Sequence, residues 1–294
     1  MVSLHLTTKD TILSSDGTRL HIKNETIDTH YAYRYLAAIY LGPNITLNSN
    51  VIAACYKYNV PIYFSREQGY IYGSTYAPGY GAGSAIALKQ LQMVGTHHTQ
   101  ELCATWLVMK FARRSMILEH LKVKYKLPSF MDFESSEVLA KEGAYDAQFW
   151  KRYLRVISNG IQLKRVKRDP PDIWNASLNY LYGMLYYLIE KELIKKHLDP
   201  YMGFHHGTSR KQKAFLFDII EPFRPFCEEI LINLRIKMKT QKVDISNGLS
   251  IEWRKTLATE FHTYIYKKQE QRFLRIKIIQ NLVKETANYI KLNG

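Results

Sequence analysis

The amino-acid sequence predicts an α+β protein, with a small N-terminal β-rich domain followed by a larger all-α domain. Two patterns support this class: short apolar segments separated by turn residues up to about residue 75, then helical periodicity from residue 85 onward. Between them, residues 76–84 (Tyr-Ala-Pro-Gly-Tyr-Gly-Ala-Gly-Ser) are rich in residues that break helices and strands. We therefore expect an N-terminal domain over residues 1–75, a linker over 76–84 and a helical domain over 85–294.

The first strands of the N-terminal domain are expected on either side of a turn. Ile12 and Leu13 precede Ser-Ser-Asp16-Gly17, which is a typical turn sequence. After it, Leu20-His21-Ile22 resumes the apolar and polar alternation of a half-buried strand.

Three further elements follow before the linker. Leu36–Leu41 is an apolar run that predicts a strand, ended by Gly42-Pro43-Asn44. Ser49–Tyr58 predicts a short helix, because it begins at a cluster of capping-type residues and carries apolar side chains on one face. Val60–Phe64 predicts another strand, which ends near Gly69.

The remainder of the chain has helical periodicity, with no repeat of fixed period and no low-complexity tract. The predicted helices cover residues 85–95, 99–126, 134–158, 172–197, 211–236, 250–267 and 268–292.

The positive charge is concentrated in the helical domain. The chain has a net charge of +15, from 41 Lys and Arg against 26 Asp and Glu. Residues 1–84 hold only six of the basic and five of the acidic residues, so nearly all the excess lies beyond them. Such a field attracts polyanions, and we expect the helical domain to bind an acidic partner.

Several classes of protein are disfavoured by composition. Cys55, Cys103 and Cys227 are far apart and form no Cys-x-x-Cys pair, which argues against a disulfide framework and a cysteine zinc site. The N-terminus lacks the apolar core of a signal peptide, and the densest apolar run, Leu181–Ile189, is too short to cross a membrane. We expect a protein of the reducing cytoplasm.

Glu142 and a histidine pair are the first candidates for chemistry. Glu142 precedes Gly143 inside a helical pattern, where glycine costs about 1 kcal/mol relative to alanine. A close approach by another backbone or a ligand explains the glycine, and an ordinary surface glutamate is the alternative. His205 and His206 lie in the segment Leu198–Gly207, whose Asp-Pro and glycines predict a loop. Such histidines can bind a metal or a phosphate.

Asp218 and Glu221 are the most specific signal that the residues give on physical grounds. They are spaced i, i+3 within a strongly apolar segment, so a helix places both on one face. Buried carboxylates need a proton, a cationic partner or a metal. A metal site and a buried ion pair with Lys or Arg both satisfy this requirement.

Carboxylates together with an imidazole suit Mg²⁺ or Mn²⁺, and the histidine favours Mn²⁺. A hard divalent cation beside a basic surface is typical of phosphodiester chemistry.

Four segments occur in a distinctive order and spacing within residues 175–225: Asn175–Tyr186, Leu198–Pro200, Gly203–His206 and Asp218–Pro225. In these segments the sequence resembles the CRISPR-associated protein one family, the integrase of spacer acquisition. Glu142-Gly143 and Val60–Phe64 are similar to family elements further upstream.

The resemblance implies a set of metal ligands. They are Glu142, His206 and Glu221, with Asp218 as an auxiliary carboxylate that supports them. His205 occupies a position that is often aliphatic in the family, so it is an alternative to His206 as the ligand.

The implied activity is the insertion of short DNA fragments (spacers) into a repeat array by transesterification, using Mg²⁺ or Mn²⁺. Basic side chains of the helical domain would then hold double-stranded and branched DNA by its phosphates. Arg224, close to Glu221, can instead pair with Asp218. The candidate DNA contacts are Arg113, Arg114, Lys151, Arg152, Arg155, Lys164, Arg165, Lys167, Arg168, Arg210, Lys211 and Arg224.

The family resemblance also implies partners. Its members form homodimers bridged by the small ferredoxin-like CRISPR-associated protein two, and the charge-balanced N-terminal domain suits dimerisation better than DNA binding. Two alternatives remain: the integrase of a casposon, a self-synthesising transposon, and a catalytically inactive DNA-binding scaffold of the same fold.

Overall fold

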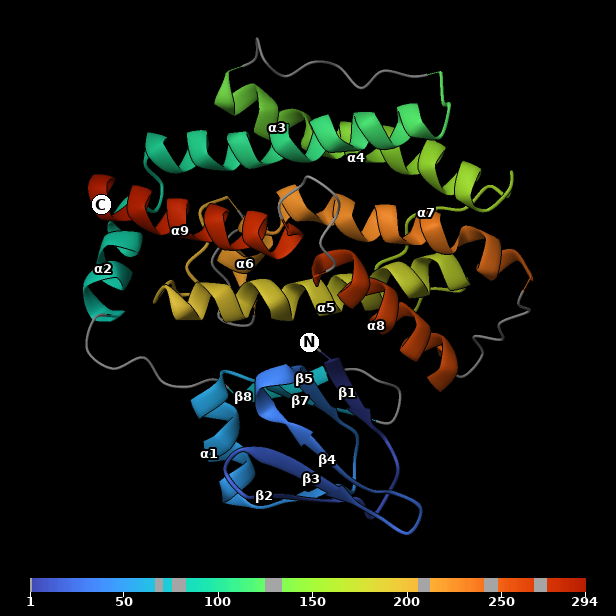
Figure 1. The fold of residues 1–294 in the computed structure, drawn as a ribbon. Coiled ribbons are helices and arrows are strands. Elements are labelled where there is room, and N and C mark those ends of the chain that lie inside the picture. The colour runs from blue at the N-terminus through green and yellow to red at the C-terminus, as the bar shows by residue number, and fades with distance from the viewer. Residues whose placement is uncertain are drawn as a thin grey trace. The chain divides into compact units, whose positions relative to one another are not determined.

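The structure is a computed structural model that describes residues 2–66, 71–75, 83–124, 134–205, 212–240, 248–266 and 274–294. It confirms the α+β class, with strands first and helices after them (Figure 1). The chain divides into two compact units. The first is Met1–Pro78 with Ile251–Thr256, and the second is Gly79–Ser250 with Leu257–Gly294. Most of the predicted linker, residues 76–82, lies outside the described residues.

The first unit contains two four-stranded sheets. In one, β5 (Leu36–Leu41) pairs in parallel with β1 (Val2–Leu6) and β7 (Ile62–Ser65), and β7 pairs antiparallel with β8 (Ile71–Thr75). This sheet has the order β1-β5-β7-β8.

The second sheet has the order β4-β3-β2-β6. It is formed by β4 (Asp28–Ala32), β3 (Arg19–Lys23), β2 (Ile12–Ser15) and β6 (Thr46–Leu47). Its apolar face contributes to the core of the unit. Among the core residues that are at most 2% exposed are Leu13, Leu20, Ile22, Ile39, Val51 and Ile62.

Helix α1 (Ser49–Tyr58) has the bounds that the sequence predicts. Its cap explains its start, because the side chain of Asn48 accepts a hydrogen bond of 3.1 Å from the backbone N–H of Val51. It ends at Asn59, whose φ of 56° is left-handed. The predicted strands correspond to β2, β3, β5 and β7, whereas β4 lacks the apolar alternation that would have indicated it.

The second unit is helical (Figure 1). Its elements are α2 (Gly83–Met93), α3 (His97–His120), α4 (Ser135–Ile157), α5 (Ile173–Lys195), α6 (Ala214–Ile219), the 3-10 turn η2 (Glu221–Phe223), α7 (Arg224–Thr240), α8 (Ile251–Tyr266) and α9 (Arg275–Asn293). The first residues of α8, Ile251–Thr256, belong to the other unit. Helix α3 packs against α4, α6, η2 and α7, so it lies where these elements converge.

The prediction of one helix over residues 211–236 is wrong. The segment forms α6, η2 and the first part of α7, and residue 211 lies outside the described residues. Pro222 lacks an N–H and its ring collides with the carbonyl four residues earlier, so an α-helix cannot continue through it. Helix α3 also ends earlier than predicted, at His120, and Lys122 follows with a φ of 56°.

No helix within the described ranges is long and apolar enough to span a membrane.

Candidate active site

Lys110 lies at the centre of the candidate site. Helix α3 buries a stripe that includes Cys103, Trp106, Leu107, Lys110 and Phe111, at the spacing of one helical face. The side chain of Lys110 is 0% exposed. A buried ammonium requires negative partners, and α4 and η2 supply them.

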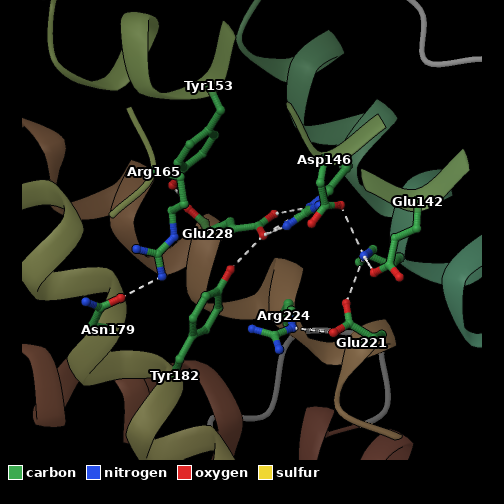
Figure 2. Close-up of polar contacts among 11 residues, drawn as sticks. Glu142, Asp146, Tyr153, Arg165, Asn179, Tyr182, Glu221, Arg224 and Glu228 are labelled. Atoms are coloured by element: carbon green, nitrogen blue, oxygen red, sulfur yellow. Dashed lines mark hydrogen bonds and ion pairs between the residues drawn. The ribbon is translucent and has the colours of Figure 1, made fainter. Parts of the chain in front are cut away.

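Carboxylates from two elements meet the Lys110 ammonium (Figure 2). Glu142 and Asp146 lie one turn apart on α4, and their oxygens are 2.7 and 3.1 Å from Nζ. Glu221, the first residue of η2, places Oε2 at 2.9 Å from the same nitrogen. Residues distant in sequence therefore direct their carboxylates at one point.

Glu221 has a second cationic partner. Its other oxygen accepts a hydrogen bond of 2.7 Å from Nε of Arg224. Burial alone would raise the pKa of Glu221, but Arg224 and Lys110 outweigh it and lower the pKa to about 2. The prediction left open a metal site or a buried ion pair here, and without a metal Glu221 forms ion pairs with both cations.

Glu142 is also held as a carboxylate. Burial would raise its pKa, whereas the neighbouring His205 and the hydrogen-bonded Lys110 lower the pKa to about 2. Nε2 of His205 lies 3.7 Å from Oε2 of Glu142, and the pKa of His205 is raised mainly by this carboxylate. Glu142 is only 20% exposed, so it is not an ordinary surface glutamate.

Asp218 contacts the loop that follows α5 and carries His205 (residues 198–205, the histidine loop). Its Oδ2 accepts hydrogen bonds from the backbone N–H groups of Phe204, at 2.6 Å, and His205, at 3.1 Å. Helix α6 ends at Ile219 and η2 begins at Glu221, so Asp218 and Glu221 lie on two adjacent helical elements and not on one α-helix. His206, Arg210 and Lys211 lie outside the described residues.

Gly143 does not mark a close approach by another backbone. A Cβ added there would meet nothing within 4 Å among the described atoms. The structure gives no packing reason for this glycine.

Arg114 belongs to the interior and not to a DNA surface, which corrects one of the predicted contacts. Its side chain is 0% exposed, and its guanidinium pairs with Glu228 at 2.7 Å and with Asp146 at 2.6 Å. Arg113 pairs with Glu229 at 2.7 Å while keeping 31% of its side chain exposed. Arg224 pairs with Glu221 and not with Asp218, the partner that the sequence offered.

Asp146 links Lys110 to a second buried network (Figure 2). Glu228 on α7 accepts hydrogen bonds from Arg114 and from the hydroxyl of Tyr182, the latter at 3.0 Å. The hydroxyl of Tyr153 donates to the backbone carbonyl of Glu228 at 2.7 Å. Helices α3, α4, α5 and α7 are thus joined at one residue, Glu228.

Arg165 is held beside the network by α5. It donates to the side-chain oxygen of Asn179 at 2.6 Å and to that of Asn175 at 3.1 Å. Lys151 and Arg155 are exposed on α4 and Arg152 is partly exposed, so these three remain candidates for DNA contact.

Lys110, Asp146 and Glu228 are parts of the site that the sequence analysis did not assign. The sequence does contain a signal for Lys110. It lies four residues after Trp106 and four before Arg114, so these three side chains share the helix face that carries the apolar residues. A charged residue at a core position of a helix indicates a buried partner.

The donor chemistry of the site fits Mg²⁺ or Mn²⁺. Carboxylates of Glu142 and Glu221 converge on one cation position, and an imidazole, that of His205, lies next to Glu142. Oxygen donors with an added nitrogen are the ligands that these ions accept.

A cluster of carboxylates in a cationic helical domain is typical of enzymes that act on phosphodiester bonds. The family model described as "CRISPR associated protein Cas1" matches residues 4–263. The chain therefore belongs to the CRISPR-associated Cas1 family.

Curated relatives agree with this assignment. The "CRISPR-associated endonuclease Cas1" of Methanothermobacter thermautotrophicus is 22% identical over 251 residues, which cover 83% of this chain and 75% of the relative. That protein is thus similar along most of both chains.

Solved structures share the fold. A CAS1 protein from Thermotoga maritima superposes with a TM-score of 0.82 at 18% identity, covering 99% of this chain and 97% of the other. A casposase bound to its integration product has a TM-score of 0.81 at 19% identity, covering 100% and 92%. A chain of a Cas6-RT-Cas1–Cas2 complex has a TM-score of 0.74 at 16% identity, covering 100% and 35%.

Proposed function

We propose that the protein is a metal-dependent DNA endonuclease and integrase that inserts short DNA fragments into a CRISPR repeat array by transesterification. The observation that carries the proposal is the convergence of Glu142 and Glu221 on the buried Lys110 ammonium, with His205 next to Glu142. Membership of the Cas1 family, whose curated relatives are named endonucleases, supports it.

The reaction exchanges one phosphodiester bond for another. The 3′-hydroxyl oxygen of the incoming DNA bonds to a target phosphorus and gives its proton to solvent. The bond from that phosphorus to the target strand's 3′-oxygen breaks, and this oxygen leaves with the bonding electrons and takes up a proton to form a new 3′-hydroxyl. A divalent cation, when bound, supplies charge stabilisation at the phosphate and the displaced oxygen. Glu142, Glu221 and a histidine of the pair His205 and His206 would hold that cation.

Residues around the ligands fix their positions. Lys110 holds Glu142 and Glu221 toward a common point, and Arg224 restrains the second oxygen of Glu221. Asp218 binds the backbone at Phe204 and His205, which sets the place of the histidine loop relative to α6. These groups reduce the reorganisation that binding a metal and a phosphate requires.

The proposed partners are double-stranded and branched DNA, a second copy of this chain and Cas2. A solved casposase holds an integration product, and a solved complex combines Cas1 with Cas2 on the same fold. Exposed Lys151 and Arg155 on α4, with Arg152 beside them, supply positive charge for phosphate contacts.

Strand transfer is the direct test. The full-length protein is mixed with labelled branched DNA and Mn²⁺, then with EDTA, and in parallel as Glu221→Ala. Activity in the first mixture that is lost in the other two supports the proposal. Glu119→Ala, a change of an exposed glutamate on α3, is the matched control and should leave activity near the unaltered level. Absence of cleavage and transfer with any divalent metal would instead favour an inactive DNA-binding scaffold.

Casposon-type integration is the second candidate, and the likeness to the casposase over 92% of that chain favours it. The two functions differ in target and partner. An integrase of repeat arrays should require Cas2 and prefer a repeat-containing target, whereas a casposase should integrate without Cas2.

A further inference from the structure

A row of polar side chains crosses the β4-β3-β2-β6 sheet, far in sequence from the carboxylates of the candidate active site. Ser14 on β2 is the register partner of His21 on β3, and His21 is the partner of His30 on β4. Directly paired residues point to the same face, so the three side chains form one row across strands that lie side by side in Figure 1. Asp28, two residues before His30, joins them on that face.

This row lies on the face of the sheet that is turned away from the core. Leu13, Leu20 and Ile22 alternate with it along β2 and β3 and are at most 2% exposed. The His21 side chain is 27% exposed and that of Asp28 is 58% exposed. Ions can therefore reach these groups from solvent, while the buried residues between them fix the strands beneath.

Donor atoms are already gathered in this row. Nε2 of His21 lies 2.6 Å from Oδ1 of Asp28, and the rings of His21 and His30 stack with centroids 4.2 Å apart at 2°. One ligand atom from each of His21, Asp28 and His30 lies within 4.8 Å of the others. In a tetrahedral site with bonds of about 2.0–2.1 Å, neighbouring donors are about 3.3 Å apart. Rotation of the two imidazoles out of their stacked arrangement would bring these donors to that spacing and direct their lone pairs at one ion.

We propose that His21, Asp28 and His30 form a binding site for a borderline transition metal of the Zn²⁺ class, with water as the remaining ligand. Two imidazoles and one carboxylate are the donor set of open zinc sites, whereas Mg²⁺ prefers oxygen alone. The site is chemically distinct from the carboxylate cluster around Lys110. It does not depend on the proposed nuclease function, so either can fail without the other.

Ser14 is placed to orient one of the ligands. Its Oγ lies 3.3 Å from Nδ1 of His21. In the structure Nε2 donates its proton to Asp28. A metal would replace that proton on Nε2, and Nδ1 would then carry the remaining proton and donate it to Ser14. Lys23 is the competing cation, with Nζ 3.8 Å from Oδ2 of Asp28, and it remains on that oxygen while Oδ1 binds the metal.

Calorimetric titration of the full-length protein with ZnCl₂ at pH 7.5 tests the site. The parent for the titration carries Glu142→Gln and Glu221→Gln, which weaken the other group of donors. Adding His21→Gln and His30→Gln should remove one bound equivalent of Zn²⁺. In the parent, Ser14→Ala should weaken binding about tenfold, the effect typical of a group that orients a metal ligand.

Matched histidine changes control for non-specific binding. His98→Gln with His120→Gln removes two exposed histidines of α3 and should leave the stoichiometry unchanged. Equal stoichiometry and affinity in the parent and in the His21→Gln, His30→Gln variant would overturn the proposal. If the double histidine variant folds poorly, Asp28→Asn provides an independent test, because it changes an exposed side chain and retains the imidazoles of His21 and His30. It should weaken Zn²⁺ binding at least tenfold.

Discussion

Lys110 is a cation at a position of α3 where the helical repeat otherwise places apolar side chains. It is fully buried and balanced by Glu142, Asp146 and Glu221 at 2.7, 3.1 and 2.9 Å. A buried ion cluster contributes little net stability when complete, but removing one member leaves the others uncompensated. Lys110 therefore controls both the stability of the unit and the alignment of the proposed metal ligands.

Replacing Lys110 by methionine keeps most of the volume and removes the charge. We expect Lys110→Met to lower the free energy of unfolding in metal-free buffer by about 3–5 kcal/mol, as for other broken buried pairs. Urea denaturation measures this change. Lys141→Met on α4 is the control, because that lysine is 41% exposed and pairs weakly with Glu137 at 3.7 Å, and it should cost less than about 1 kcal/mol. Equal effects of the two changes would contradict the central role of Lys110.

The lowered pKa values of Glu142 and Glu221 predict an acid-sensitive fold. Both pKa values fall to about 2, below the unfolded value of about 4.3. The stability that these carboxylates contribute is complete above the unfolded pKa and is lost as the pH falls from about 4.3 toward 2. Urea unfolding at a series of pH values should show this decline. In Glu142→Gln the decline should be shallower, and an unchanged slope would refute the assignment.

At the scale of elements, the short turn η2 determines the position of Glu221, one of the proposed metal ligands. Pro222 ends the helical path after α6, so Glu221 turns to Lys110 and Arg224 while Asp218 turns to the histidine loop. The break therefore gives the two acidic residues different tasks.

The sequence predicted those elements whose signals are local. Helix α1 has its capping residue in the chain, and β5 is an unbroken apolar run, so neither depends on distant contacts. Glu142 was assigned as a ligand from the family resemblance, and Glu221 from that resemblance and from its apolar neighbours. Lys110 and Asp146 were not assigned, because a single charged residue in a helix usually faces solvent, and their pairing requires that α3 pack against α4.

The neighbouring pairs Arg114–Glu228 and Arg113–Glu229 both join α3 to α7, and they provide a comparison at this scale. Each glutamate also accepts a hydrogen bond from a tyrosine, Glu228 from Tyr182 and Glu229 from Tyr264, but Glu228 is 0% exposed whereas Glu229 is 25% exposed. Glu228→Gln should lower the free energy of unfolding by about 3–5 kcal/mol, because it removes a negative partner of the buried Arg114 guanidinium and leaves part of its positive charge uncompensated. Glu229→Gln should cost about 1 kcal/mol or less, because water partly replaces the lost pair. Urea denaturation separates the two, and a reversed order would refute the assignment of Glu228 as the buried link.

At the scale of the whole molecule, the separation of charge along the chain predicts where DNA binds. Most of the net charge of +15 lies beyond residue 84, and on α4 Lys151 and Arg155 are exposed with Arg152 beside them. Each phosphate that a protein neutralises releases counterions, which gives a slope of about −0.9 in the logarithm of the binding constant against that of salt. The number of contacts can therefore be counted by varying salt alone.

Replacing Lys151, Arg152 and Arg155 together by glutamine should weaken duplex binding and reduce the magnitude of the salt slope by up to about 2.7, the amount for three lost phosphate contacts. Fluorescence anisotropy of a labelled duplex between about 50 and 200 mM salt measures the slope, in the salt range where such effects are large. The matched control replaces three exposed basic residues of the first unit, Lys9, Arg34 and Lys57, and so removes the same charge. If net charge alone drove binding, both triple variants would reduce the magnitude of the salt slope equally. If α4 contacts the DNA backbone, only the first variant lowers it.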